Sequence, residues 1–314
     1  MSLTQEVGAQ LAEIRVPANE RSQGSSIQPA HSLFGRRQPA DDRVERSEIQ
    51  AVILAAGRGN RLRSVIHDQP KCLAPVGGRT LIEHQLELLW LAGIHRVAVV
   101  TGYRAAQVRK ALGTRVEYFH NKDWARTEGL HSISLCREWV TGPLVVLNCD
   151  VLADPELLSR LLHGPGNAFV FDSTSGADAE EMAVEFDDGY LAAMSKDLPV
   201  ERTHGENVGI LYLDKWAVRL LFDQAEAMLK SGESKARLPA ALQRVARYIP
   251  FRGIDIADLS WIEVDFPDDL DVARHIIWPA ICIRLGSAQP LAADFPQRAV
   301  QSHSLQLQTV AQQR

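Results

Sequence analysis

The sequence predicts an α/β protein whose central sheet is mixed and mainly parallel. Short apolar runs, which are typical of buried strands, alternate with segments that carry apolar residues at helical spacing. Strands and helices in this order form right-handed βαβ units and parallel strand pairs. The chain has 314 residues, of which 46% are hydrophobic, so it can bury one large core of this kind.

The alternation of expected strands and helices is clearest in the first half of the chain. Leu86 and Leu89 share one face of an expected helix, and Thr80 with Glu83 has the sequence of a capping box at its start. Gly93 is placed to end that helix. The expected elements are strands at residues 51–55, 96–101, 116–119, 144–148 and 168–171, and helices at 80–91, 105–112 and 154–162.

The second half adds antiparallel pairing. An Asp-Asp-Gly turn at residues 187–189 separates two short apolar runs, which predicts a β-hairpin of residues 183–186 and 190–194. Pro267 suits the first turn of a helix. The other expected elements are strands at 208–213 and 261–265 and helices at 215–230, 235–247 and 267–277.

The two ends of the chain differ from its middle. Residues 1–48 are rich in Gln, Ser, Pro and Arg and have few large apolar side chains, so we expect a disordered arm. The Gln-, Ala- and Ser-rich tail at 284–314 has the same character. One folded domain is therefore expected over residues 49–283.

Composition argues against several classes of function. Lys and Arg number 34 and Asp and Glu 39, a formal charge of −5, so neither nucleic acid nor an anionic membrane is expected as a partner. The four cysteines form no CxxC pair and are expected to be buried thiols rather than metal ligands or disulfides. No signal peptide or apolar run of membrane-spanning length is evident, which favours a cytoplasmic enzyme.

A loop with two glycines follows the first expected strand. Gly57 and Gly59 allow the backbone to approach a polyphosphate, Arg61 adds a guanidinium fork, and Lys71 adds a point charge further along. A Walker A loop is excluded because Gly-Lys-Ser/Thr is absent, and Leu62 stands where a dinucleotide fingerprint needs its third glycine. The alternative is an ordinary two-glycine turn, but the added cations favour a phosphate site.

Three carboxylates stand in positions that suit a metal ion. Asp150 follows a buried strand, and open α/β sheets bind ligands beyond the carboxyl ends of their strands. Glu263 and Asp265 are two residues apart and therefore share one face of a strand. Mg²⁺ prefers such oxygen ligands. Taken alone, these residues also fit a turn before a helix, a solvated strand face and a helix cap.

Two stretches carry a family resemblance. Leu54-Ala-Ala-Gly-Arg-Gly-Asn-Arg-Leu62 and Pro70-Lys-Cys-Leu-Ala-Pro-Val76 resemble the signature of nucleotidyltransferases that make sugar nucleotides and CDP-alcohols. The likeness covers about residues 49–278 and is closest to the phosphocholine cytidylyltransferase-like branch. It implies a Rossmann-like three-layer αβα sandwich with a mixed, mainly parallel central sheet, of the nucleotide-diphospho-sugar transferase type. Asn60 stands where Ser or Thr is common.

The resemblance implies roles for individual residues. The nucleotide would be bound by Leu54, Ala55, Ala56, Gly57, Gly59, Asn60, Arg61, Lys71 and Gly102. The acceptor would be bound by Glu128, Gly129, Ser132, Asp172, Lys196 and Glu206. The resemblance also favours the metal reading of the three acids, so that Asp150, Glu263 and Asp265 would hold Mg²⁺. The catalytic positions would be Arg61, Lys71 and Lys196.

We therefore expect a Mg²⁺-dependent nucleotidyltransferase that uses an NTP, with CTP favoured, and a small phosphorylated alcohol or phosphonate as acceptor. Glu128 and Gly129 replace the paired asparagines of some cytidylyltransferases, so the acceptor is left open. The alternatives are a sugar-1-phosphate nucleotidyltransferase and a nucleotide sensor without turnover. A glycosyltransferase is disfavoured because no Asp-x-Asp follows the central strand. The sequence does not fix the oligomeric state.

Overall fold

The structure, a computed structural model, describes residues 46–175 and 181–286. The arm expected at 1–48 and the tail expected at 284–314 lie almost wholly outside these ranges. Within them, every helix is too short or too polar to cross a bilayer.

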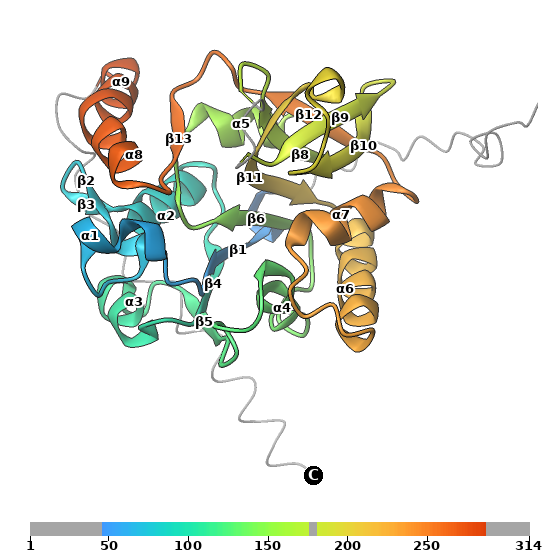
Figure 1. The fold of residues 1–314 in the computed structure, drawn as a ribbon, viewed down its shortest axis with the longest axis horizontal. Coiled ribbons are helices and arrows are strands. Elements are labelled where there is room, and N and C mark those ends of the chain that lie inside the picture. The colour runs from blue at the N-terminus through green and yellow to red at the C-terminus, as the bar shows by residue number, and fades with distance from the viewer. Residues whose placement is uncertain (1–45, 176–180, 287–314) are drawn as a thin grey trace, which may run out of the picture. The chain divides into compact units, whose positions relative to one another are not determined.

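A nine-stranded sheet forms the centre of the described part (Figure 1). Every strand except β10 and β11 runs in the same direction, as the strand pairings show, so the sheet is mixed and mainly parallel as predicted. Its strands, in order across the sheet, are β5 (Glu117–His120), β4 (Arg96–Thr101), β1 (Gln50–Ala55), β6 (Leu144–Asn148), β11 (Gly205–Leu213), β8 (Asn167–Asp172), β12 (Phe251–Asp255), β10 (Tyr190–Ser195) and β9 (Ala183–Asp187).

Helices cover both faces of this sheet and make the three layers (Figure 1). One face packs against α2 (Leu81–Leu91), α3 (Ala105–Leu112) and α5 (Glu156–Leu162). The other packs against α4 (Gly129–Ser134), α6 (Lys215–Lys230) and α7 (Leu238–Ala246). A third, smaller cluster joins α1 (Arg63–Ile66), α8 (Pro267–Val272) and α9 (Trp278–Arg284).

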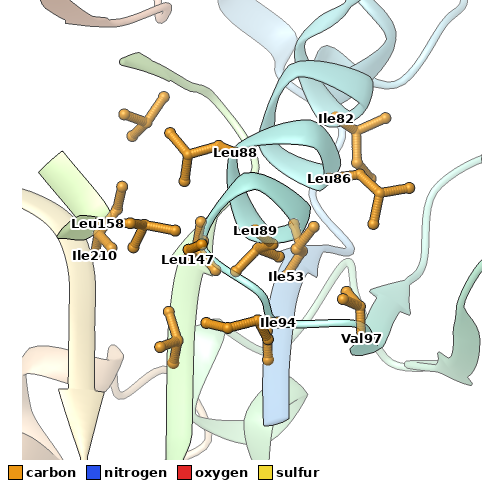
Figure 2. Close-up of a cluster of buried hydrophobic side chains, with 14 of the residues drawn as sticks. Ile53, Ile82, Leu86, Leu88, Leu89, Ile94, Val97, Leu147, Leu158 and Ile210 are labelled. Carbon is orange, nitrogen blue, oxygen red and sulfur yellow. The ribbon is translucent and has the colours of Figure 1, made fainter. Parts of the chain in front are cut away.

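Alternation along the central strands explains the two cores. In β1, Ile53 faces the α2 side of the sheet, whereas Val52 faces the α6 side. Figure 2 shows Ile53 and Leu147 of β6 beside Leu86 and Leu89 of α2. Since both faces of these strands are buried, they read as continuous apolar runs in the sequence.

Two small antiparallel pairs stand beside the main sheet. β2 (Pro75–Val76) pairs with β3 (Arg79–Thr80), and β7 (Val151–Ala153) pairs with β13 (Trp261–Glu263). After β3, the backbone N–H of Thr80 donates to the Glu83 carboxylate at 2.9 Å, as the predicted capping box requires. Short 3-10 turns occur at Arg46–Glu48, Asn60–Leu62, Lys71–Leu73 and Val200–Arg202.

The single helix predicted at 267–277 is wrong in its interior. It is α8, followed by a π-helical turn (Ala273–Ile277) that leads into α9. Pro279, in the first turn of α9, has no N–H to donate back to the carbonyl of His275. We attribute the local widening of the helix to this missing donor.

Candidate active site

The loop after β1 reaches the site because it leaves the carboxyl end of β1, which lies between β4 and β6 in the sheet. Gly59 takes a left-handed conformation, with φ of 70°. A Cβ at this position would lie 2.5 Å from the Cβ of Lys71. The absence of a side chain therefore lets the loop pack directly on Lys71, and the 3-10 turn that follows presents Arg61.

Lys71 lies at the centre of the charged side chains of the site, in contact with two carboxylates. Its side chain is only 10% exposed, and its Nζ lies 2.8 Å from Asp150 Oδ2. The same ammonium group forms an ion pair with Asp265, whose Oδ2 also lies 3.2 Å from Arg61 Nη1. Segments that are almost 200 residues apart in the chain thus meet at one point.

The β7–β13 pair brings the acids together. Glu263 pairs with Val151, and the N–H of Val264 donates to the carbonyl of Asp150 at 3.0 Å. Ligand atoms of Asp150, Glu263 and Asp265 consequently lie within 4.8 Å of one another.

Asp269, in the first turn of α8, fixes the backbone of the third acid. Its carboxylate accepts hydrogen bonds from the backbone N–H of Asp265 at 2.8 Å and of Phe266 at 2.7 Å.

The charged groups of the cluster shift one another's pKa values. Burial, with the neighbouring charge of Asp150, raises the pKa of Glu263 to about 8. Burial also opposes the charge of Lys71, but the two facing carboxylates outweigh it and raise the pKa of Lys71. Burial likewise disfavours ionised Asp265, yet Lys71 and Arg61 hold the pKa of its carboxyl below the ordinary value.

These acids fit a divalent cation. Asp150 Oδ1 is buried and has no hydrogen-bond donor in the described part of the chain. Such an unpaired carboxylate oxygen is costly unless a cation approaches it. A cluster of three carboxylates offers the hard oxygen ligands that Mg²⁺ prefers.

A cleft of about 620 Å³ opens at the ends of β1 and β6 and includes this cluster. It therefore brings most of the predicted site residues to one place. The predicted residues that line it are Leu54, Ala56, Gly57, Gly59, Asn60, Arg61, Lys71, Glu128, Gly129, Ser132, Asp150, Lys196, Glu263 and Asp265.

Two of the predicted nucleotide-binding residues do not line the cleft. The side chain of Ala55 belongs to the buried core. Gly102 packs closely against the backbone of Ala56, which does line the cleft. A Cβ at Gly102 would lie 2.5 Å from the carbonyl oxygen of Ala56.

Two of the predicted acceptor-binding residues also lie outside the lining. Asp172 is buried and accepts hydrogen bonds from Trp261 Nε1 at 2.7 Å and from the N–H of Thr174 at 2.8 Å. Glu206 is buried as well and accepts from Ser175 Oγ at 2.9 Å. In this structure both carboxylates bind other parts of the protein.

Several other residues also line the cleft. Trp124 and Asn121 lie in the segment before α4, and Asn121 holds Ser132 in place through a 3.1 Å hydrogen bond. Asn148 ends β6, so its position at a buried strand end could have indicated it. Arg237 immediately precedes α7, in no recognisable motif.

Comparisons with known proteins identify the family of this chain. Residues 51–244 match the family model described as "MobA-like NTP transferase domain". The CMP-5'-(3-aminopropyl)phosphonate synthase of Streptomyces rubellomurinus is 30% identical over 70% of this chain and 37% of its own length. The bifunctional IPC transferase and DIPP synthase of Rubrobacter xylanophilus is 29% identical over 77% of this chain and 55% of its own. The chain thus spans less than two thirds of these two relatives.

Solved structures show the same fold. The inositol-1-phosphate CTP transferase of T. maritima superposes with a TM-score of 0.63 at 23% identity, covering 76% of this chain and 97% of that one. The CTP:phosphocholine cytidylyltransferase of Streptococcus pneumoniae gives 0.61 at 20% identity, over 73% and 98%. The predicted nucleotide-diphospho-sugar transferase type of fold is confirmed. With more than half of its length matched, this chain belongs to the MobA-like NTP transferase domain family.

Proposed function

We propose that this protein transfers CMP from CTP to a small phosphorylated alcohol or a phosphonate and releases pyrophosphate, with Mg²⁺ as cofactor. One observation carries the proposal: a glycine loop, the Lys71 ammonium and three carboxylates face a single cleft large enough for a nucleotide and a small acceptor. An anion-binding loop beside a cation-binding cluster suits the transfer of a phosphorus group.

Asp150 and Asp265 are the proposed Mg²⁺ ligands, with Glu263 beside them. The unpaired Oδ1 of Asp150 supports this assignment. When bound, the ion supplies positive charge to the phosphate oxygens and helps to orient them. The remaining contributions come from the protein's own side chains.

The acceptor oxygen that attacks the α-phosphorus belongs to a phosphate or phosphonate, which is already anionic at neutral pH. A strong general base is therefore not required, and the work of the site is positioning and charge neutralisation. We assign Lys71 and Arg61, which line the cleft, to the phosphates of the nucleotide, where negative charge increases as pyrophosphate leaves. We assign Lys196, which lines the same cleft, to the acceptor phosphate.

The named activities of relatives support cytidylyl transfer. The Streptomyces rubellomurinus relative forms a CMP-phosphonate by name, and a relative in Campylobacter jejuni, 22% identical, is a CTP:phosphoglutamine cytidylyltransferase. A second candidate is a sugar-1-phosphate nucleotidyltransferase, because several proteins named GlmU are also relatives. One of them, from Picosynechococcus, is 36% identical over 36% of this chain.

Pyrophosphate release from the full chain tests the proposal. Each of the four NTPs is combined with choline phosphate, aminoethylphosphonate, inositol phosphate and hexose 1-phosphates, with Mg²⁺ present or chelated. We expect release that requires CTP, an organophosphate or phosphonate acceptor and Mg²⁺. Release only with a hexose 1-phosphate would establish the second candidate, whereas nucleotide binding without release from any pair would favour a sensor.

A further inference from the structure

The cationic side chains that line the cleft differ in whether they form ion pairs with carboxylates of the protein. Lys71 and Arg61 both form ion pairs with the acidic cluster. Arg58 lies over the Tyr103 ring, 5.1 Å from its centroid. Arg237 also lines the cleft, but among the described residues no carboxylate lies within ion-pair distance of its guanidinium group.

The backbone around Arg237 is firmly placed. The preceding carbonyl, of Ala236, accepts a hydrogen bond from the N–H of Leu130, and the following side chain, Leu238, is 7% exposed. Further along α7, Gln243 Nε2 donates to the carbonyl of Met194 in β10 at 2.9 Å. Arg237 is therefore an exposed cation on a rigid part of the wall.

This wall belongs to the acceptor half of the cleft. The strand against which α7 packs, β10, ends at Ser195 and delivers Lys196 to the cleft. The cations assigned to the triphosphate, Arg61 and Lys71, come instead from the loops after β1, on the other half of the sheet. Arg237 and Lys196 thus provide two positive charges from separate segments on the side where the acceptor is expected.

We propose that Arg237 binds a carboxylate on the acceptor, so that the preferred substrates are phosphorylated hydroxy acids or amino acids rather than simple phosphorylated amino alcohols. The proposal rests on the proposed function and names its acceptor class. A guanidinium group binds a carboxylate through two parallel N–H···O bonds, and such charge-assisted pairs are stronger than neutral ones. We assign the phosphate that attacks to Lys196, which lines the same cleft.

Two acceptors that differ by one carboxylate give a matched test. O-Phosphoserine is phosphoethanolamine with a carboxylate on the amine-bearing carbon. With CTP and Mg²⁺, we expect the full chain to have a kcat/KM for phosphoserine at least about tenfold above that for phosphoethanolamine. Arg237→Gln should remove this preference by raising the KM for phosphoserine about 10- to 100-fold, with kcat and the phosphoethanolamine reaction almost unchanged.

Arg219→Gln is the control variant, because Arg219 is an exposed arginine on α6 that does not line the cleft. Equal or better use of phosphoethanolamine by the wild type, or an unchanged KM for phosphoserine in Arg237→Gln, would overturn the inference.

Calorimetry without turnover separates this inference from the proposed function. Phosphoserine is titrated into the wild type and into Arg237→Gln with CTP present and divalent metal chelated. Weaker binding to the variant alone supports the carboxylate contact even if no acceptor releases pyrophosphate, a result that would reject only the proposed function. Equal binding to both proteins, or no binding to either, contradicts the role of Arg237.

Discussion

The two halves of the central sheet are built differently. From β5 to β6 every neighbouring pair of strands is parallel. Beyond β6, β11 enters antiparallel to both of its neighbours, and β8 pairs with β12, more than 80 positions later in the sequence. The first half holds the glycine loop and Lys71, and the second holds Lys196 and leads to Arg237.

The site shows the same contrast. At the end assigned to the nucleotide, Lys71 is buried and held by two carboxylates. At the end assigned to the acceptor, Arg237 is exposed and has no ion-pair partner among the described residues. We infer that the first region fixes the reaction and the second selects the acceptor. Substitutions in the first should then lower kcat, and those in the second should change KM, acceptor preference or stability.

Lys71→Met should have the largest effect. It removes a buried cation that we assign to the triphosphate, so kcat should fall on the order of 10³-fold. Pyrophosphate release measures the loss, and circular dichroism with the melting temperature checks the fold. Lys110→Met, on the exposed face of α3, is the matched control and should retain full activity. Substantial turnover by a folded Lys71→Met protein would remove Lys71 from the mechanism.

Gly59→Ala should have the next largest effect, and Gly78→Ala is its control. Both glycines have positive φ, so alanine at either position costs about 1 kcal/mol of stability. A Cβ at Gly59 would also press on Lys71 at 2.5 Å, whereas one at Gly78 would meet nothing within 4 Å. We expect kcat to fall roughly 10- to 100-fold in Gly59→Ala alone, because it displaces the lysine. Similar kcat values for the two variants would show that the contact with Lys71 does not position it.

The secondary structure of the two halves could be predicted from the sequence to different extents. The helices expected at 105–112 and 215–230 match α3 and α6 from end to end, since each carries a regular apolar face. β12 was missed because its five residues include Gly253 and its partner strand is remote in the sequence. Short strands of this kind are stabilised by tertiary pairing rather than by a local pattern.

The site residues, like the strands and helices, could be predicted only where a local sequence pattern marks them. Lys71, Asp150 and Asp265 stand in recognisable motifs, and the structure brings them together. Arg237 lies in no motif, and only the placement of α7 carries it to the cleft. The sequence could therefore indicate the reaction more readily than the residues that select the acceptor.

Asp172→Asn tests whether the Asp172 carboxylate stabilises the fold or binds the acceptor. The Asp172 carboxylate accepts hydrogen bonds from Trp261 and Thr174 in a buried position. An amide can preserve only part of this arrangement, so we expect a loss of about 1–3 kcal/mol in the free energy of unfolding, with an unchanged KM for the acceptor. Urea denaturation and steady-state kinetics measure the two quantities. A raised KM at unaltered stability would instead restore Asp172 to the acceptor site, as the sequence suggested.

Glu206→Gln should have the smallest effect, visible only in the pH dependence of stability. Burial, opposed by the Ser175 hydrogen bond and aided by nearby Glu181, raises the pKa of Glu206 to about 7. Between pH 4.5 and 7 the folded protein therefore keeps a proton that the unfolded chain releases. The stability that this proton contributes is fully present below pH 4.5 and is lost as the pH rises through 7.

Glutamine is neutral throughout this range. From pH 5 to pH 8 the wild type should lose this stability and the variant should not. The melting temperature of Glu206→Gln minus that of the wild type should therefore increase by a few degrees over this range. Glu201→Gln, at an exposed position, should follow the wild type. If all three proteins give parallel curves, the carboxylate is already ionised in the folded state at pH 5. Glu206 would then be charged in the folded protein, as the predicted role in acceptor binding requires.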